Sequence, residues 1–315
     1  MAMTLRIDDA AHRFGLDDFA STSPDSNAWS HAWAVQQSWG PGLLDIGESG
    51  YVTTTYANGF ETEADLFGST ASIDTMTSVA LYSGATRIWQ MQGAVDVAAG
   101  SVGAGVNDAV LLAGDDDLIG NAWNNKLEGF GGNDYIDGGY GTDTAVFSGS
   151  YFDYDYSRDG GTIRTSGPDG YDTLVSVERL EFDDYGLAFD VNGTAGEAYR
   201  LYQAAFDRVP DLGGLGFQMA ALDDGLSLSQ VANNFIHSPE FGARYGALGN
   251  TQFVTQLYAN VLHRAPDSGG LAFHVSHLNA GMSRADVLVG FSESPENQAN
   301  VIGQIDHGMF FVPHG

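Results

Sequence analysis

The sequence contains no cysteine, which excludes disulfide bonds and thiolate metal sites anywhere in the chain. Lysine is almost as scarce, because Lys126 is the only one. Against 12 basic residues stand 41 acidic ones, which gives the 315-residue chain a formal net charge of −29. This charge argues against nucleic acid or an anionic membrane surface as a partner. No apolar run approaches the roughly 20 residues that cross a bilayer, so membrane insertion is not expected.

Two further absences concern export and catalysis. The first residues hold no apolar run followed by a small-residue cleavage site, so no ordinary cleaved signal peptide is predicted. The chain also lacks the Gly-x-Ser-x-Gly elbow of lipases, the His-Glu-x-x-His helix of zinc proteases and a phosphate-binding Gly-Lys-Thr loop. We therefore expect no catalysis. The one enzymatic alternative is a carboxylate-based hydrolase with its active site in residues 1–100. There Glu61, Glu63 and Asp65 could be a catalytic or metal-binding group, although such an acidic group more often forms a solvated turn.

Glycine, in contrast, is abundant, and over residues 102–146 it recurs with a period of nine. Four of the five units have glycine at the fourth place, and all five have an apolar residue at the eighth. The sixth place is held by Asn107, Asp116, Asn125, Asp134 and Asp143. Because glycine tolerates tight backbone turns, we expect each unit to form a six-residue turn and a three-residue strand with its middle side chain pointing inward.

The pattern resembles the RTX nonapeptide, the repeat of a calcium-binding parallel β-roll. In such a roll two units complete one coil, so turns eighteen residues apart share an edge. The resemblance implies calcium, which prefers several oxygen ligands, at two sites and leaves a third open. The first would use the side chains of Asp116 and Asp134 with the carbonyls of Leu112, Gly114, Gly129 and Gly131. The second would use Asn125 and Asp143 with the carbonyls of Asn121, Trp123, Gly138 and Tyr140, and the third would pair Asn107 with Asn125. The alternative is a Gly/Asp turn array that binds nothing.

The segments beside the repeats complete a mixed, multidomain fold. Residues 1–100 are predicted to be mainly β, with a helix at 23–39 and strands at 51–56, 78–82 and 86–90. The β-roll occupies 101–147. Residues 148–192 form a β segment, with strands at 162–165, 173–176 and 179–182, that covers the open end of the roll. An all-α domain follows at 193–300, and the tail 301–315 is compatible with the uncleaved secretion signal that RTX proteins use for type I export.

The helical domain is an internal duplication with a period of 56 residues. Arg208-Val-Pro-Asp-Leu-Gly-Gly matches Arg264-Ala-Pro-Asp-Ser-Gly-Gly, and Ser238-Pro-Glu matches Ser294-Pro-Glu. Serine before proline predicts a helix N-cap, and Ser227 with Gln230 predicts a capping box. Residues 195–300 resemble the DUF4214 domain, a helical module found beside RTX repeats. Related segments occur in surface-layer proteins, where such a region attaches the lattice to lipopolysaccharide.

Three smaller clusters each have a structural and a functional interpretation. His263, His274 and His277 could hold a metal, but exposed helix histidines are the favoured interpretation. The duplicated arginine and aspartate of the Pro-Asp turns could line a polar pocket, but turn-stabilising contacts are favoured. Five aromatic residues could stack on a sugar, although packing is the more common role of alternating aromatics: Tyr151, Phe152, Tyr154, Tyr156 and Tyr171.

Together these features predict a secreted, calcium-binding surface or extracellular-matrix protein. It would fold when it meets calcium, and its helical domain would serve assembly, by self-association, or anchoring at the bacterial cell surface. The alternative is an adhesin or surface spike that binds a surface polysaccharide or lipopolysaccharide through residues 1–100 or through the helical pair.

Overall fold

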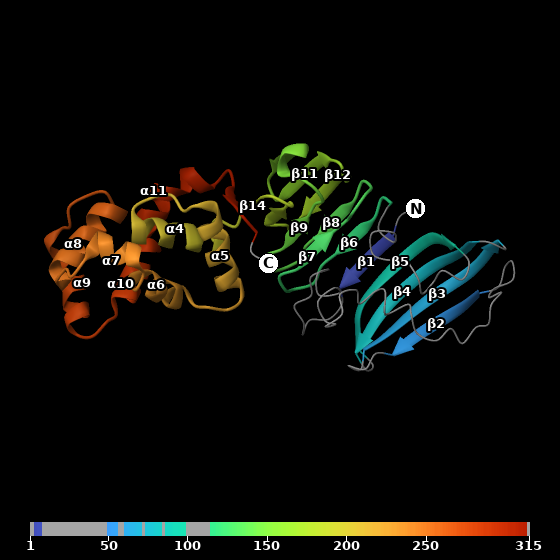
Figure 1. The fold of residues 1–315 in the computed structure, drawn as a ribbon, viewed down its shortest axis with the longest axis horizontal. Helices are drawn as coiled ribbons and strands as arrows, with labels where there is room; N and C mark the ends of the chain where they lie inside the picture. The colour runs from blue at the N-terminus through green and yellow to red at the C-terminus, as the bar shows by residue number, and fades with distance from the viewer. Residues whose placement is uncertain are drawn as a thin grey trace. The chain divides into compact units, whose positions relative to one another are not determined.

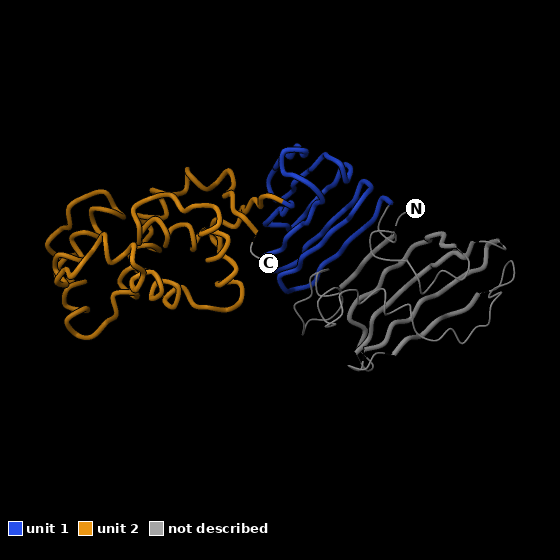
Figure 2. Tube along the Cα trace, in the orientation of Figure 1, with its two compact units in different colours: residues 1–183 blue, residues 184–315 orange. Residues whose placement is uncertain are grey.

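The computed structural model describes residues 114–313 with their side chains and, within residues 3–98, the backbone of five strands. The predicted helix at 23–39, Asn107 and Leu112 lie outside the described residues. The chain divides into two compact units, residues 1–183 and 184–315 (Figure 2). Strands fill the described part of the first unit and helices dominate the second (Figure 1), which confirms the expected β-then-α layout.

The N-terminal strands are arranged as an antiparallel sheet. They are β1 (Met3–Ile7), β2 (Ser49–Thr55), β3 (Phe60–Thr70), β4 (Ile73–Ser83) and β5 (Thr86–Ala98). β2 to β5 pair in sequence order, and β1 pairs with β5. Three of these strands, β2, β4 and β5, confirm the sequence prediction. The expected turn at Glu61, Glu63 and Asp65 was wrong, because these residues lie in β3. Pairing with strands on both sides outweighs the polar composition of β3.

The repeats form short strands at the seventh to ninth place of each described unit. They are β6 (Asp117–Ile119), β7 (Lys126–Glu128), β8 (Tyr135–Asp137) and β9 (Thr144–Val146). β6 pairs in parallel with β8, and β7 pairs in parallel with β9, so alternate units share a ladder. The eighth residues are buried, as predicted: Leu118, Leu127, Ile136 and Ala145 are each no more than 1% exposed. Burying one apolar side chain per unit is what holds the ladders together.

The segment after the repeats extends both ladders. A 3₁₀ turn (Tyr151–Asp153) leads into β10 (Asp155–Asp159), β11 (Thr162–Gly167) and β12 (Gly170–Val175), which pair antiparallel in that order. β12 then pairs in parallel with β8, and β13 (Arg179–Glu181) pairs in parallel with β9. The predicted strands in this segment are therefore confirmed. Each ladder gains a third strand from outside the five repeats.

The second unit is a duplicated set of helices with a pair of short antiparallel strands, one before and one after the helices. The first repeat consists of α4 (Thr194–Phe206), α5 (Leu212–Asp223), α6 (Leu228–Ile236) and α7 (Pro239–Tyr245). The second consists of α8 (Asn250–Val261), α9 (Ser268–Asn279), α10 (Arg284–Ser292) and α11 (Pro295–Ile305). β14 (Gly186–Ala188) pairs antiparallel with β15 (Met309–Phe311). The C-terminal tail, proposed from the sequence as a secretion signal, thus contributes a strand to this unit.

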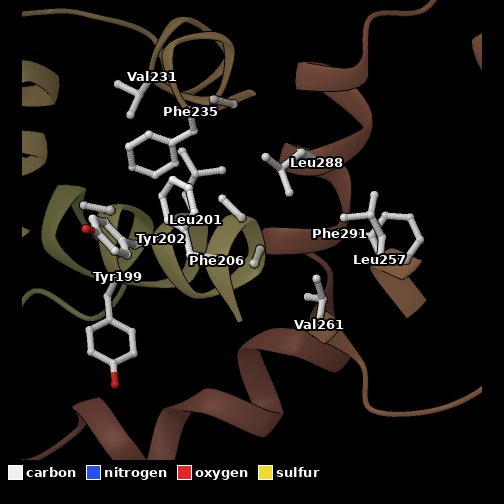
Figure 3. Close-up of a cluster of buried hydrophobic side chains, with 14 of the residues drawn as sticks. Tyr199, Leu201, Tyr202, Phe206, Val231, Phe235, Leu257, Val261, Leu288 and Phe291 are labelled. Atoms are coloured by element: carbon white, nitrogen blue, oxygen red, sulfur yellow. The ribbon is translucent and has the colours of Figure 1, made fainter. Parts of the chain in front are cut away.

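Local sequence signals fix the helix ends, and one shared core joins the repeats. The predicted capping box of Ser227 and Gln230 is present, and Ser238 and Ser294 cap α7 and α11 ahead of proline. Phe206 of α4, Phe235 of α6 and Phe291 of α10 lie in one buried cluster (Figure 3). Since equivalent helices of both repeats supply this cluster, neither repeat buries its apolar face alone.

Candidate metal centre

Two columns of polar side chains, all buried except the partly exposed Glu178, run beside the parallel ladders. The first column contains Asp116, Asp134 and Asp172, which are 2%, 3% and 3% exposed. The backbone N–H of Asp116 donates to Oδ1 of Asp134 over 2.9 Å, and the N–H of Asp134 donates to Oδ1 of Asp172 over 3.0 Å. Each carboxylate is therefore tied to the unit before it, so that three carboxylates stack along one edge.

The second column contains Asn125, Asp143 and Glu178. The N–H of Asn125 donates to Oδ1 of Asp143 over 2.6 Å, and the N–H of Asp143 donates to Oε2 of Glu178 over 2.8 Å. Asn125 is 2% exposed and Asp143 is fully buried. The spacing of eighteen residues predicted the pairs Asp116–Asp134 and Asn125–Asp143, and the structure brings both pairs together.

Glycine allows backbone oxygens to approach these columns. Gly132, with φ of +152°, and Gly141, with φ of +124°, occupy the fourth place of their units. A side-chain carbon on Gly132 would collide with the carbonyl oxygen of Gly114 and lie 3.0 Å from Oδ1 of Asp134. The turns thus bring a bare carbonyl and a carboxylate to the same place, which is the donor set that calcium prefers.

Burial raises the pKa of the central carboxyl group in each column. The pKa of Asp134 rises to about 7, first because burial removes water and then because Asp172, Asp116 and Asp115 lie close; the N–H of Asp116 opposes this rise. The pKa of Asp143 rises to about 8, again chiefly through burial, with Glu178 and Asp137 adding to the rise and the N–H of Asn125 opposing it. A bound cation would remove this penalty, because it stabilises the ionised form.

One buried carboxylate oxygen indicates that a cation fits this site. Oδ2 of Asp143 is buried and accepts no hydrogen bond from the residues that the structure describes. A buried carboxylate oxygen without a donor is costly. No group of three or more Asp, Glu, His or Cys side chains among the described residues could hold a metal by itself. A metal ion here would therefore need backbone carbonyls as well, which the glycine turns provide.

The remaining predicted carbonyl ligands are placed unevenly. A side-chain carbon on Gly120 would meet both the Gly138 carbonyl and, at 2.5 Å, Oδ1 of Asn125, so these two oxygens lie close together. The Asn121 carbonyl instead accepts the N–H of Tyr140 over 3.0 Å. Three further predicted ligands, Gly129, Gly131 and Trp123, lie in the expected turns. Of these, Gly129 lies against Oδ2 of its own Asp134, and Trp123 against Gly141.

Asp172, Ser176 and Glu178 extend the columns and were not predicted from the period of nine. The signal for Asp172 was present, because Gly167-Pro-Asp-Gly-Tyr-Asp-Thr-Leu-Val175 has glycine at the fourth place, aspartate at the sixth and leucine at the eighth. Leu174 is fully buried, as the eighth residues of the repeats are. The period of nine does not continue to residues 167–175, because the β10–β11 hairpin separates them from the other five units.

The other sequence candidates have structural roles in this fold. Arg208 pairs with Glu240 over 2.9 Å, and Arg264 pairs with Glu296 over 2.6 Å. Asp211 and Asp267 cap α5 and α9. These contacts confirm the turn-stabilising interpretation of the duplicated motif.

The histidines and aromatics show the same preference for packing. His274 lies against the ring of Phe291, with centroids 4.7 Å apart, and Nδ1 of His277 donates to the Phe273 carbonyl over 2.8 Å. Tyr154 is 7% exposed and packs on Phe147 and Phe182. The aromatic candidates do not share one surface, because Phe152 and Tyr171 are about three-quarters exposed while Tyr154 is core.

The helical unit contains one further candidate site, a groove of about 430 Å³ between α6 and α10. Its lining is mostly amide, hydroxyl and carboxylate: Leu226, Ser229, Gln230, Asn233, Asn234, Ser283, Ala285 and Asp286. Asp286 accepts from Ser229 over 2.9 Å and from Ser283 over 2.6 Å, which lowers the pKa of its carboxyl group, chiefly through Ser283.

Comparison with known proteins identifies a domain in the second unit. Residues 232–301 match the family described as "Domain of unknown function (DUF4214)", which confirms the resemblance over that range. No curated protein matches the chain. Among solved structures, the chain is similar to the extracellular lipase LipA from Serratia marcescens, at 21% identity over 22% of this chain and 13% of that one. The TM-score is 0.15, so this similarity supports no conclusion.

Within the residues that the structure describes, no helix has the length and apolar character to cross a bilayer.

Proposed function

We propose that this chain is a secreted, calcium-binding RTX-type protein of the bacterial surface or extracellular matrix, without catalysis. Residues 102–183 would form a β-roll that folds when calcium binds between its coils. The helical unit would serve assembly or anchoring. The observation that carries the proposal is the pair of buried columns, in which carboxylates stack one above another and each is bound to the backbone of its neighbour.

The charge balance supports a cation rather than a proton as the partner of these carboxylates. The only lysine, Lys126, is 2.8 Å from Glu181 and so already forms an ion pair. Protonation could neutralise Asp134 and Asp143, but only below about pH 7 and pH 8. Calcium at the millimolar concentrations outside a cell would neutralise the two carboxylates above these pH values as well. The net charge of −29 on the chain would favour calcium binding.

A calcium titration of the full chain tests this function. We expect calcium, and not an equal concentration of magnesium, to increase β-structure in circular dichroism and to raise the melting temperature, since magnesium demands a tighter octahedral site. Asp134→Asn should weaken the response, whereas Glu181→Gln, which removes an equal charge outside the columns, should not. Light scattering in the same titration measures self-association. An unchanged spectrum and melting temperature in calcium would refute the proposal.

The groove between α6 and α10 supports a second candidate function, the binding of a surface polysaccharide. The side-chain amides of Asn233 and Asn234 border it from α6, while Ser283 and Asp286 border it from α10. Paired amides and a carboxylate match the donors and acceptors of sugar hydroxyl groups. Isothermal titration with purified lipopolysaccharide and neutral glycans tests this role. Binding that Asn233→Ala and Asn234→Ala reduce would support it, and no binding would remove it.

A further inference from the structure

The two columns end differently after the repeats. At the end of the first column, Asp172 has both carboxylate oxygens occupied: Oδ1 by the N–H of Asp134, and Oδ2 by the hydroxyl of Thr165 over 3.0 Å. The place beside Gly167 is filled by the ring of Tyr154, with which any side-chain carbon on that glycine would collide. The first column is therefore closed by protein groups.

In the second column, the atom that matters belongs to Asp143, one coil before the last member, Glu178. Oδ1 of Asp143 faces the preceding unit, where it accepts the N–H of Asn125. Oδ2 is buried and accepts no hydrogen bond from any described residue. A side-chain carbon on Gly138 would lie 2.7 Å from this Oδ2 and would also collide with the Ser176 carbonyl oxygen. Oδ2 of Asp143 and the carbonyl oxygen of Ser176 thus border one small volume, which stays open because Gly138 has no side chain.

Glu178 brings a second carboxylate to Asp143. Its Oε2 accepts the N–H of Asp143 over 2.8 Å, so the two carboxylates belong to adjacent coils. Ser176 has φ of +52°, a backbone conformation that non-glycine residues rarely adopt. The N–H groups of Glu178 and Arg179 both donate to the Asp143 carbonyl over 3.0 Å, which fixes the segment in place.

We propose that Ser176 and Glu178 complete a divalent-cation site with Asp143, one coil beyond the last site that the repeats themselves define. The ligands are Oδ2 of Asp143, the carbonyl oxygen of Ser176 and the carboxylate of Glu178. Hard oxygen donors with two negative charges select calcium over softer metals. This inference rests on the proposed function, because it adds a ligand set from outside the repeats to the same calcium-dependent roll. The Asn125–Asp143 pair supplies only one carboxylate, and Glu178 adds a second carboxylate on the same edge of the roll.

Calcium binding to the full chain, measured by isothermal titration calorimetry and equilibrium dialysis, tests the site. Glu178→Gln keeps the size of the side chain and an acceptor for the Asp143 N–H, but it removes a charged ligand. We expect it to lose one bound calcium, or to bind that calcium on the order of tenfold or more weakly, because ligand charge sets the affinity of such sites. Glu181→Gln is the matched control, because it makes the same change three residues further along the chain, at a carboxylate that pairs with Lys126 and belongs to neither column, and it should bind as the wild type does.

Glu178→Asp provides a second test in case removal of the charge alters folding. It retains the charge but withdraws the carboxylate by one methylene group, so it should also weaken one calcium site. If Glu178→Gln and Glu178→Asp both match Glu181→Gln in stoichiometry and affinity, the assignment of Glu178 is overturned. If the wild type binds no calcium at all, the proposed function fails first, so the two failures are distinguishable.

Discussion

Asp143→Asn should make the calcium-free protein more stable at alkaline pH while it weakens calcium binding. In the folded chain the pKa of Asp143 is about 8, against 3.8 for the unperturbed group. The folded state therefore binds this proton more tightly than the unfolded state does. Its contribution to stability is complete below pH 3.8, decreases as the pH rises, and is lost above about pH 8.

The size of the effect follows from the shift. Each unit of pKa difference corresponds to about 1.4 kcal/mol, so ionising Asp143 in the folded state costs at most roughly 6 kcal/mol. Water entry and side-chain rearrangement relieve part of this cost, and we expect ~2 to ~5 kcal/mol. A domain is stable by only about 5 to 15 kcal/mol, so one buried carboxylate can decide whether the calcium-free roll folds at pH 8.

The assay is urea unfolding in a calcium chelator between pH 4 and pH 9, followed by circular dichroism. The free energy of unfolding of the wild type should fall across this range. Asparagine has no charge and can still accept the N–H of Asn125 through Oδ1, so the curve of the variant should be flatter. The two proteins should be nearly equal at pH 4, and the variant should be more stable at pH 8. The reasoning is refuted if the wild type is as stable at pH 8 as at pH 5 without calcium, or if the variant is the less stable protein at pH 8.

Three further predictions concern the helical unit. Arg200→Ala should lower the free energy of unfolding by ~3 to ~5 kcal/mol, because it leaves Glu293 without the guanidinium group, only 5% exposed, with which it pairs. Arg264→Ala removes an arginine that is 40% exposed in its pair with Glu296, and its effect should be much smaller. Equal losses in urea unfolding would contradict the difference in burial. Phe253→Ala should cost ~3 to ~5 kcal/mol through a core cavity, and Phe273→Ala, at a side chain 57% exposed, under about 1 kcal/mol; similar thermal shifts for both would rule out this core assignment. Ser238→Ala removes the N-cap of α7 and should cost about 1 kcal/mol in the same melts, so a neutral result would show that the cap is dispensable.

The repeats were the most predictable part of the fold. Glycine at the fourth place and an apolar residue at the eighth favour a turn and an inward-facing strand by local geometry alone. Every described unit forms this strand, including residues 120–128, which have Trp123 at the fourth place. The helix caps were predictable for the same reason, since Ser227 and Ser238 satisfy N–H groups only a few residues away. Strand β3 was not, because its stability comes from neighbours on both sides rather than from its own composition.

The candidate site was predictable only in part. The period of nine identified Asp116, Asp134, Asn125 and Asp143, because residues eighteen apart meet in any fold of this kind. It could not identify Glu178, whose place in the second column depends on where β13 pairs with β9 after the intervening hairpin. The number of residues between Asp143 and Glu178 does not follow the period of nine, so it does not predict their contact.

The sequence by itself therefore determined the repeating units, the helical duplication and the acidic balance of the chain, since each depends on local spacing or on composition. Only the tertiary structure decided where the two columns end. Thr165 and Tyr154 close one column, while Asp143 in the other keeps a buried oxygen that no described residue satisfies. The physical reason is that a ladder's last partner is chosen by strand pairing and packing between segments distant in the chain, which no local pattern specifies.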